Sequence, residues 1–538
     1  MKKDSTSRVL ALVSSRWEWM LAIALALAAC FVFTNFGMAW DDAQHAVYGS
    51  YVLDYFLSGF RDMRWQTDIG GLYYYGTIFD MPSAALHRWF GVDLFQWRAL
   101  LMAFTGILAI PAVAGIGRFV GGNRTAAFSV AALLLMPQFV GQSFINCKDI
   151  PLASAVAWSV LAILRITSDV GWRSFLFCGL MFGITLSVRI GGILVLVYAF
   201  ALVGFLVLRS LVNKKLPGDL KWCLGKNLHW IALGALLVTW ILTVSLWPYA
   251  HQNPFLNLLK SFQQSAAFPQ PYPVLYVGQV FESTELPWHY LPLMLILTMP
   301  LPIVLLAGSG LFVSIWRFLR GWQEEHAERL FLVLFWIAFP IAYVIVKQPN
   351  IYDGVRHFLF VLPALAVMAG VGAGALSDAI NRFLRPLGVA APCLLLACAA
   401  PALFKMHPYQ YAFYNALAGD KETLHERFET DYWITSYREA ATILNRQQML
   451  ATRPLHVAVG ANALSISCFS QFADPRLKIA FFLGSTDDSP FPTDMDFTVA
   501  VPRYGMWRNF PNAAVAADIR RDGILMCVIR SRDGKTAP

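Results

Sequence analysis

The stretch WEWMLAIALALAACFVFTNFGMAWDDAQHAVYG, residues 17–49, changes its character halfway along. Its first half is an apolar run, and a helix needs about 20 apolar residues to cross the hydrocarbon core of a membrane. Two adjacent carboxylates, Asp41 and Asp42, follow shortly after the run. The stretch therefore predicts a membrane helix over residues 17–38, with a pair of acids at the membrane face where the helix ends.

The composition of the whole chain indicates a protein that crosses the bilayer many times. Of its 538 residues, 57% are hydrophobic and only 14% are charged, whereas a soluble protein carries about 25% charged residues. Arg189 and the glycines after it divide the stretch 172–213, because an arginine in mid-bilayer is costly. The apolar runs predict about eleven spans, at residues 17–38, 96–118, 125–143, 150–166, 172–188, 191–212, 228–247, 290–316, 328–346, 356–376 and 386–404.

Lysine and arginine residues gather in alternate connections between these runs, and no internal repeat is visible. Such connections face the cytoplasm in membrane proteins, so the N-terminus is predicted to be cytoplasmic. The opposite face then carries a long first loop at residues 39–95, the loop 248–289 and everything after about residue 405. The net charge of +9 follows from these scattered basic residues, and their pattern does not favour a surface for nucleic acid.

The end of the chain differs in composition from the rest. From about residue 405, short apolar stretches such as LHVAVGA and ILMCVIRS alternate with turn residues and a helix-like segment. This pattern predicts a small α/β domain outside the membrane at residues 405–538, after a membrane domain at residues 1–404. Its two cysteines, Cys468 and Cys527, are expected to form either a disulfide or two buried thiols.

Several ionisable residues lie at the predicted outer ends of the spans, on the same face as the acid pair. Asp80 precedes Pro82 in the first loop, and Lys148 and Asp149 begin the fourth span. An aspartate there can simply cap a helix, and a lysine can extend its ammonium group toward lipid headgroups. The functional alternative is a general base with basic partners for a lipid phosphate. The same face receives further candidates for binding a substrate: Arg61, Arg64, Glu282, Trp288, His289, Arg356 and His357.

Five segments, taken in order, resemble parts of the GT-C membrane glycosyltransferases. The branch concerned contains the protein O-mannosyltransferases and the bacterial lipid A aminoarabinose transferase, and the resemblance covers about residues 17–405. The segments are WDDAQHAVYG, FINCKDIPLASA, GITLSVRIGGILVL, PWHYLPLMLILTMPLPIVLLAG and GVRHFLFVLPALAVMAG. The resemblance implies a GT-C fold in the bacterial inner membrane. It also implies transfer of a hexose or pentose from a polyprenyl-phosphate donor to an envelope glycan, lipid or protein on the outer face.

The resemblance also implies roles for individual residues. Asp41 matches the catalytic base, Asp42 stands where relatives usually have glutamate, and Asp80 matches a second acid ahead of a proline. Relatives among the aminoarabinose transferases have a lysine after that second acid, usable for phosphate, where this chain has Met81. The phosphate partner must then come from elsewhere, and the candidates are Lys148, Arg61, Arg64 and Arg356. One base and one basic cradle favour inversion by direct displacement.

Other functions compete with this interpretation. A secondary transporter places its charges near the bilayer midplane, often in two repeated halves, whereas here they lie at the outer ends of spans. A flippase for lipid-linked glycans shares the donor lipid, and an assay of donor breakdown separates it from a transferase. A purely structural protein gives no reason for acids and bases to converge on one face. No cofactor is expected. Some GT-C enzymes bind a divalent cation between loop acids, and Asp41, Asp42 and Asp149 could do so if they converge. This alternative is not favoured, because a carboxylate site for Mg²⁺ needs several oxygens in good geometry.

Overall fold

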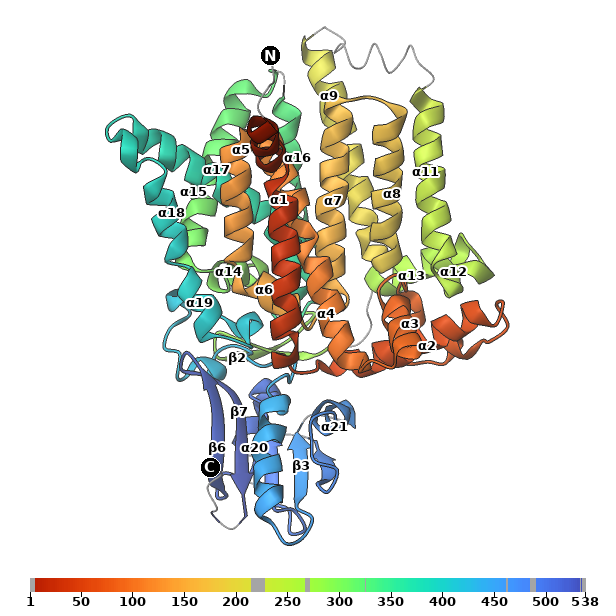
Figure 1. The fold of residues 1–538 in the computed structure, drawn as a ribbon, viewed down its shortest axis with the longest axis vertical. Helices are drawn as coiled ribbons and strands as arrows, with labels where there is room; N and C mark the ends of the chain where they lie inside the picture. The colour runs from red at the N-terminus through yellow and green to blue at the C-terminus, as the bar shows by residue number, and fades with distance from the viewer. Residues whose placement is uncertain are drawn as a thin grey trace.

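The computed structural model of the protein describes residues 5–213, 228–266, 271–324, 326–460, 463–483, 490–532 and 534. Long helices run side by side in one bundle, and a small sheet domain lies beyond one end of it (Figure 1). The N-terminus lies at the opposite end from this sheet domain. The sequence predicted an odd number of membrane spans between the N-terminus and the sheet domain, and this arrangement agrees with that prediction.

The described helices coincide with the predicted spans. Seven of them are long and apolar enough to cross a membrane, and three shorter apolar helices accompany them in the described part of the chain. The bundle helices are α1 (Ser5–Val32), α4 (Leu94–Ile107), α5 (Ala109–Leu134), α7 (Asp149–Ser168), α8 (Trp172–Val188), α9 (Leu194–Asn213), α11 (Leu228–Ser245), α14 (Tyr290–Leu297), α15 (Leu301–Gly321), α16 (Ala327–Lys347), α17 (Leu362–Asn381), α18 (Ala390–Ala397) and α19 (Ala400–Lys405). The protein is therefore a polytopic α-helical membrane protein.

The apolar run Leu94–Leu134 contains a reversal of the chain. At Gly122 the backbone has φ 79° and ψ −171°, a conformation open essentially to glycine alone. A Cβ atom added to Gly117 would lie 2.8 Å from the Cα of Ala126, although nine residues of straight helix span about 13 Å. The run is thus a helical hairpin, as the separate spans predicted at 96–118 and 125–143 require.

The helix also ends where Arg189 was expected to break it. Arg189 has an extended backbone (φ −158°, ψ 137°) directly after α8, and the short 3-10 helix η4 (Ile190–Ile193) leads into α9. The predicted span at 290–316 differs slightly, because it is divided into α14 and α15 at Pro300. Proline has no N–H to continue a helix, which explains the division.

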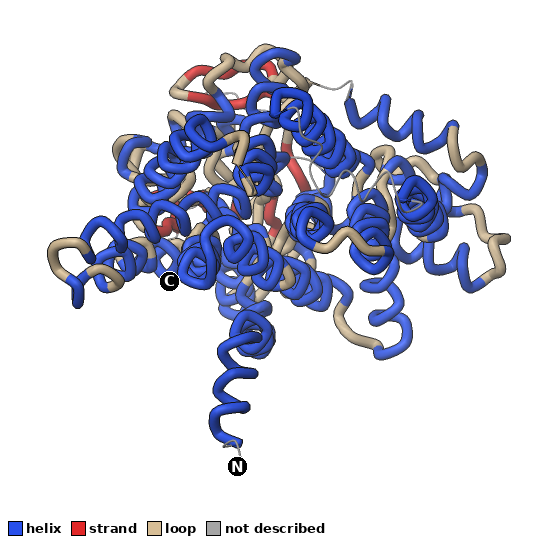
Figure 2. The backbone as a smooth tube through the Cα atoms, turned by 90° about the horizontal axis from the view of Figure 1, so that it is seen from above, coloured by secondary structure: helices blue, strands red, loops and turns tan. Residues whose placement is uncertain are grey.

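The centre of the bundle is formed by α7 and the segment Arg356–Asn381, which contains the 3-10 helix η5 (Arg356–Val361) and α17. These segments are the most buried of the long apolar helices in the described chain, because 78% and 83% of the residues in their most apolar stretches are buried. Figure 2 shows the helices end-on, with the first turns of α1 projecting away from the others. Both central segments begin at the end of the bundle that faces the sheet domain (Figure 1).

The first outer loop closes this end of the bundle. Its helices α2 (Trp40–Leu57) and α3 (Asp80–Phe90) lie across the ends of the bundle helices (Figure 1). The loop between α11 and α14 adds α12 (Pro248–Gln252), α13 (Leu256–Ala266) and a hairpin of β1 (Pro273–Tyr276) with β2 (Gln279–Glu282). Both long loops therefore cover the same end, as their predicted sidedness requires.

The C-terminal region contains the predicted α/β domain. Its sheet has the order β4-β3-β5-β7-β6, with β3 parallel to β4 and β5 and with β7 antiparallel to β5 and β6. The elements are α20 (Tyr437–Leu450), β3 (His456–Gly460), α21 (Ala463–Ser470), β4 (Lys478–Phe482), β5 (Phe497–Ala500), β6 (Ala514–Arg521) and β7 (Ile524–Ser531). Cys468 and Cys527 are buried free thiols, so the structure has the second of the two predicted alternatives.

The boundary between the two parts is broader than predicted. Residues 406–436 belong to neither the long helices nor the sheet, and buried aromatic rings such as Tyr411 and Trp433 fix them to the bundle. The amide of Gln142 in α6 (Pro137–Gln142) donates to the Tyr432 hydroxyl at 2.7 Å. We call residues 406–436 the connector.

Candidate active site

The first turn of α2 sends its two acids to different surroundings. Successive residues of an α-helix point about 100° apart, so Asp41 and Asp42 cannot share one environment. The Asp41 side chain is 23% exposed, whereas that of Asp42 is only 6% exposed. Neither caps the helix, because the N-cap is Ala39 without a side-chain bond, so the capping interpretation does not apply to them.

Asp42 belongs to a closed cluster of charged groups. The Arg98 guanidinium binds Asp80 at 3.0 Å and Asp42 at 3.3 Å, and His45 Nδ1 lies 2.7 Å from the second oxygen of Asp80. Arg98 is fully buried and also donates to the hydroxyl of Ser83 at 2.9 Å. We call Asp42, His45, Asp80 and Arg98 the Arg98 cluster. It joins α2, α3 and α4 at the end of the bundle.

The pKa values of the two acids of this cluster are shifted in opposite directions. Burial alone would raise the pKa of Asp80, but the charges of His45 and Arg98 outweigh it and hold the pKa below its usual value. Asp42 has a single cationic hydrogen-bond partner in Arg98, so burial dominates and its pKa is raised. The sequence did not single out Arg98, although an arginine inside an apolar span is a recognised indication of a functional or structural partner.

Asp41 faces a second, more open cluster. Its carboxylate lies 2.8 Å from the Lys148 ammonium group and 3.8 Å from the Arg356 guanidinium. Burial would raise the pKa of Asp41, but these two cations outweigh it and hold the pKa well below its usual range. Burial would likewise lower the pKa of Lys148, and the charge of Asp41 raises it instead. Asp41 and Lys148 are therefore an ion pair at neutral pH.

A third cation, Arg189, approaches the same place from the break between α8 and α9. The Lys148 ammonium group and the Arg189 guanidinium lie 5.3 and 5.5 Å from the centre of the Tyr75 ring. Cations are attracted to aromatic faces at such distances. We call Asp41, Lys148, Arg189 and Arg356 the Asp41 cluster. The sequence predicted a helix break at Arg189 but not its place in this cluster.

Asp149 supports this cluster rather than capping α7. Its carboxylate accepts hydrogen bonds from Arg189 at 3.0 Å and from the Asn146 amide at 3.0 Å. The N-cap of α7 is Lys148, which makes no side-chain bond there, so the capping alternative does not apply to Asp149. Asn146 in turn donates to Gln142, so the position of Arg189 is linked to the connector through three hydrogen-bonded side chains.

Arg356 carries unused donors in this buried place. Its side chain is only 6% exposed, and one nitrogen lies 3.1 Å from the carboxylate of Asp353. Its Nε and Nη1 atoms have no hydrogen-bond acceptor among the described residues. The rings of Tyr352 and Trp433 lie against its guanidinium at 4.6 Å each. Buried donors without acceptors are costly, so this geometry is suited to an anion that enters the cluster.

The other predicted residues have different surroundings. His357 packs edge-on against Tyr352 at 4.8 Å, next to the Asp41 cluster. Arg61 and Arg64 lie beyond the far end of α2, whose 18 residues span about 27 Å. Arg64 is 56% exposed and binds Asp54 and Asp62. The structure therefore does not bring these two arginines to the Asp41 cluster.

Residues of the β1–β2 hairpin and the segment after it also remain outside the cluster. Glu282 and Trp288 are exposed, the latter at 62%. His289 accepts or donates a hydrogen bond with the Tyr276 hydroxyl at 2.7 Å. Within the described ranges, none of the three has an ion pair or a hydrogen bond with Asp41, Lys148 or Arg356.

The Arg98 cluster contains one group of possible metal ligands. Ligand atoms of His45, Asp80 and Cys147 lie within 4.8 Å of one another. The fit to a cation is poor, because the Arg98 guanidinium already binds Asp80 and would repel a second positive charge. We assign no metal to these residues, and the expectation of an enzyme without a metal stays a prediction.

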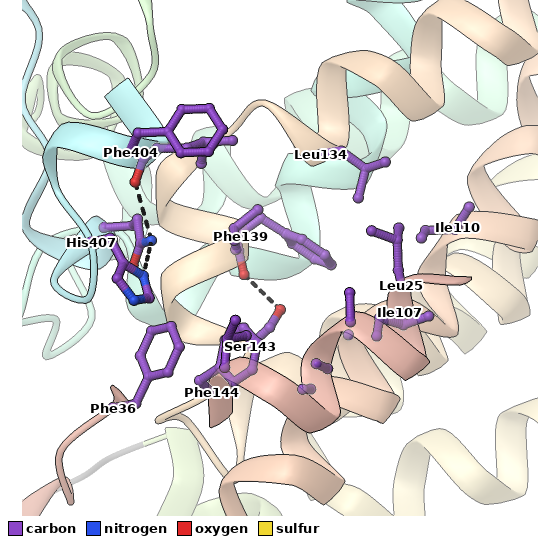
Figure 3. A pocket seen from close by; sticks show the side chains of 18 residues that line it. Leu25, Phe36, Ile107, Ile110, Leu134, Phe139, Ser143, Phe144, Phe404 and His407 are labelled. Carbon is purple, nitrogen blue, oxygen red and sulfur yellow. Dashed lines mark hydrogen bonds between the residues drawn. The ribbon is translucent and has the colours of Figure 1, made fainter. Parts of the chain in front are cut away.

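An apolar cavity of about 380 Å³ lies elsewhere in the bundle, between α1, α4, α5, α6 and α19. In Figure 3, Leu25, Ile107 and Ile110 line one side of it, and Phe404 and His407 lie on the other. Ser143, His407 and Gln410 are the polar side chains of its lining. No residue of either charged cluster lines this cavity, so it is separate from the candidate site.

Comparisons with known proteins were made for sequence and for fold. Residues 84–247 match the family model described as dolichyl-phosphate-mannose-protein mannosyltransferase. A comparison with curated proteins gave no match. The matched segment begins within α3 and includes Arg98, Lys148 and Arg189, whereas Asp41 and Arg356 lie outside it.

Two solved structures cover nearly the whole chain. ArnT from Cupriavidus metallidurans in the apo state aligns with a TM-score of 0.50 and 17% identity, over 98% of this chain and 99% of that one. The oligosaccharyltransferase AglB from Archaeoglobus fulgidus, in complex with an inhibitory peptide and a dolichol-phosphate, aligns with a TM-score of 0.52 and 12% identity. That alignment covers 91% of this chain and 70% of AglB. The predicted GT-C fold is thereby confirmed.

Proposed function

We propose that the protein is an integral membrane glycosyltransferase that takes a sugar from a polyprenyl-phosphate donor. The observation that carries this proposal is the convergence of Lys148 and Arg356 on Asp41, with unused donors on a buried Arg356. Arg189 adds a third positive charge, which shares the Tyr75 ring with Lys148. The description of the matching family model and the dolichol-phosphate bound by AglB support a lipid phosphate as the anion.

The reaction is a direct displacement at the anomeric carbon of the donor sugar. Asp41 removes a proton from a hydroxyl or amine of the acceptor as that group attacks the carbon. The bond between the anomeric carbon and the phosphate oxygen breaks, and the polyprenyl phosphate leaves with the electron pair. Lys148 and Arg356 stabilise the negative charge of this leaving group, since charge-assisted hydrogen bonds to phosphate are strong. One base and one displacement give inversion of configuration.

The ion pairs of Asp41 explain how the donor prepares the base. A carboxylate held by Lys148 and Arg356 has a low pKa and accepts a proton poorly. A phosphate that enters the cluster attracts the same two cations. Their interaction with Asp41 weakens, so the pKa of Asp41 rises toward the range of a useful general base. Asp41 is therefore active only when a donor is bound.

The location of the reaction follows from the predicted sidedness. The acid pair and the sheet domain lie at the end of the bundle opposite the N-terminus, and the basic connections place the N-terminus in the cytoplasm. The reaction then takes place on the outer face of the bacterial inner membrane, with an envelope glycan, lipid or protein as acceptor. Reporter fusions after Arg385 and after Tyr409 are expected to report opposite sides, and equal signals would overturn this orientation.

The donor assignment is tested with purified protein in lipid nanodiscs. Undecaprenyl phosphate is expected to bind, and undecaprenol, which lacks the phosphate, is expected to bind far more weakly. Equal binding of both lipids would overturn the role of the cationic cluster. A panel of undecaprenyl-phosphate-linked sugars then tests transfer, because a transferase releases undecaprenyl phosphate whereas a flippase leaves the donor intact. Mass spectrometry of the cell envelope with and without the gene identifies the sugar and the acceptor.

A further inference from the structure

Arg503 is an arginine of the sheet domain that lies deep in the molecule. It begins the 3-10 helix η10 (Arg503–Arg508), between β5 and β6, yet it is only 2% exposed. Its guanidinium donates to the backbone oxygen of Tyr432 in the connector at 2.6 Å. A fully buried arginine is rare unless it is paired, so its remaining partners show what it does.

The strongest partner of Arg503 is Asp353, which has no exposed surface. The Arg503 guanidinium lies 2.7 Å from one Asp353 oxygen, and the other oxygen lies 3.1 Å from Arg356. Arg356 in turn lies 3.8 Å from Asp41. Charges of alternating sign thus run from the sheet domain to the proposed base without a break. The backbone of Asp353 has a φ of 59°, a left-handed conformation that places its carboxylate between the two arginines.

Arg503 also contacts the residue next to the base. Its guanidinium lies 4.3 Å from the centre of the Trp40 ring, and Asp41 follows Trp40 in α2. Arginine packs well on tryptophan faces. The first turn of α2 is therefore held by the sheet domain as well as by the bundle.

A nearby carboxyl group does not neutralise Arg503. Glu429 of the connector is buried, and this burial raises its pKa to about 8 against the opposing charge of Arg503. Glu429 is thus mostly uncharged at neutral pH. Asp353 is then the carboxylate that Arg503 and Arg356 share, and two cations share one negative charge.

We infer that Arg503 is a positioning residue for the transferase site, and that the sheet domain is a working part of that site. By sharing Asp353, Arg503 leaves the Arg356 guanidinium with charge and N–H groups available to the donor phosphate. Without Arg503, the full charge of buried Asp353 would act on Arg356 and compete with the phosphate. This inference rests on the proposed function, since it assigns Arg503 to the same donor site.

The inference is tested with full-length variants and undecaprenyl phosphate as the probe. Arg503→Met is expected to weaken binding of the probe at least about tenfold, a typical coupling between sites. Adding Asp353→Asn removes the unshared negative charge, and the double variant is expected to bind within about threefold of wild type. Arg503→Lys keeps the charge and is expected to stay close to wild type. Arg508→Met, in the same short helix but exposed, is the matched control.

The outcomes separate the two proposals. Absence of binding in the wild type would overturn the proposed function, and the inference with it. Binding in the wild type and unchanged binding in Arg503→Met would overturn the inference alone. A merely structural role predicts that the double variant binds no better than Arg503→Met, so absence of rescue also overturns it. If Arg503→Met does not fold, the double variant, which no longer buries the Asp353 charge, carries the test, and a tenfold loss in it overturns the inference.

Discussion

Two clusters of charged residues lie on either side of the first turn of α2, and they differ in how completely their charges are matched. In the Arg98 cluster every acid has a partner within 3.3 Å, and the arginine has no exposed surface. In the Asp41 cluster the side chain of the proposed base, Asp41, is 23% exposed, and donors of Arg356 remain without acceptors among the described residues. Adjacent residues of one helix thus lie in a closed site and in an open one.

This difference separates residues that hold the loop from residues that react. In the Arg98 cluster each carboxylate already has a cationic partner, and these ion pairs join α2, α3 and α4. Only the Nε2 atom of the buried His45 ring lacks a hydrogen-bond partner among the described residues of this cluster. In an open cluster the unmatched cations are costly to bury, and a bound anion lowers that cost. The comparison therefore predicts that variants of the open cluster change activity, whereas variants of the closed cluster change stability.

The largest effect is expected from Asp41→Asn. An amide cannot accept the acceptor's proton, and a general base contributes roughly 10²–10⁴-fold to the rate. Turnover in a transfer assay is expected to fall by that factor. The thermal unfolding temperature is also expected to fall, because Lys148 and Arg356 lose their shared carboxylate, so turnover is measured at a temperature where the variant is folded. Asp62→Asn, a partly exposed acid of the same loop that lies outside both clusters, is the matched control and is expected to keep full turnover. Near wild-type turnover in Asp41→Asn would remove the distinction between the clusters.

The second effect tests the closed cluster. Arg98→Met leaves the buried carboxyl group of Asp42 without a cationic hydrogen-bond partner and Asp80 with His45 alone, and breaking a buried ion pair costs about 3–5 kcal/mol. The free energy of unfolding is expected to fall by that amount, as measured by thermal or denaturant unfolding in detergent. Arg88→Met removes a half-exposed partner of Asp54, and exposed pairs contribute about 0–1 kcal/mol. Equal losses in the two variants would show that the Arg98 cluster does not hold the loop.

The sequence predicted the membrane helices and the location of the two clusters better than the contacts within the clusters. Long apolar runs mark the membrane helices, because hydrocarbon allows few alternatives. The outer face was predicted from the distribution of basic residues, and both clusters do lie together at one end. Asp41, Asp42, Asp80, Lys148 and Arg356 were all among the predicted site residues.

The pairing of these residues could not be predicted from one sequence. Arg98 meets Asp42 across 56 positions, and Lys148 meets Asp41 across 107, and local patterns do not report contacts at such separations. Arg98 and Arg189 did leave an indication, since each interrupts apolar sequence where a charge is costly. Arg503 left none, because an arginine in a polar segment of a soluble domain is ordinary.

The third effect concerns Lys148. If Lys148 binds the donor phosphate, Lys148→Ala is expected to weaken the binding of undecaprenyl phosphate by about 10–100-fold, because a charge-assisted bond to phosphate is lost. Lys148→Arg is expected to restore part of the loss. Lys260→Ala, an exposed lysine of α13 at the same end of the bundle, is the matched control. Unchanged affinity in Lys148→Ala would move the assignment to Arg356.

The smallest effect is expected from Asp42→Asn, the neighbour of the base. Asn has nearly the same size as Asp and keeps one side-chain oxygen as an acceptor for Arg98, and Arg98 keeps Asp80 and Ser83 as partners. Turnover is expected to stay within about threefold of wild type, and the free energy of unfolding within about 1 kcal/mol at pH 7. Equal loss of turnover in Asp41→Asn and Asp42→Asn would instead indicate a shared role, and the comparison would fail.

The pH dependence of stability sharpens this last prediction. Burial raises the pKa of Asp42 above 3.8 in the folded protein, so the folded state keeps a proton that the unfolded chain has released. Stability therefore falls as the pH rises from about 3.8 through the raised pKa, and Asp42→Asn lacks this contribution. The contribution of Asp80 varies with pH in both proteins, so it largely cancels in the difference between their free energies of unfolding. The free energy of unfolding of Asp42→Asn, relative to wild type, is thus expected to rise across that window. A flat difference would mean that Asp42 is as well paired as Asp80.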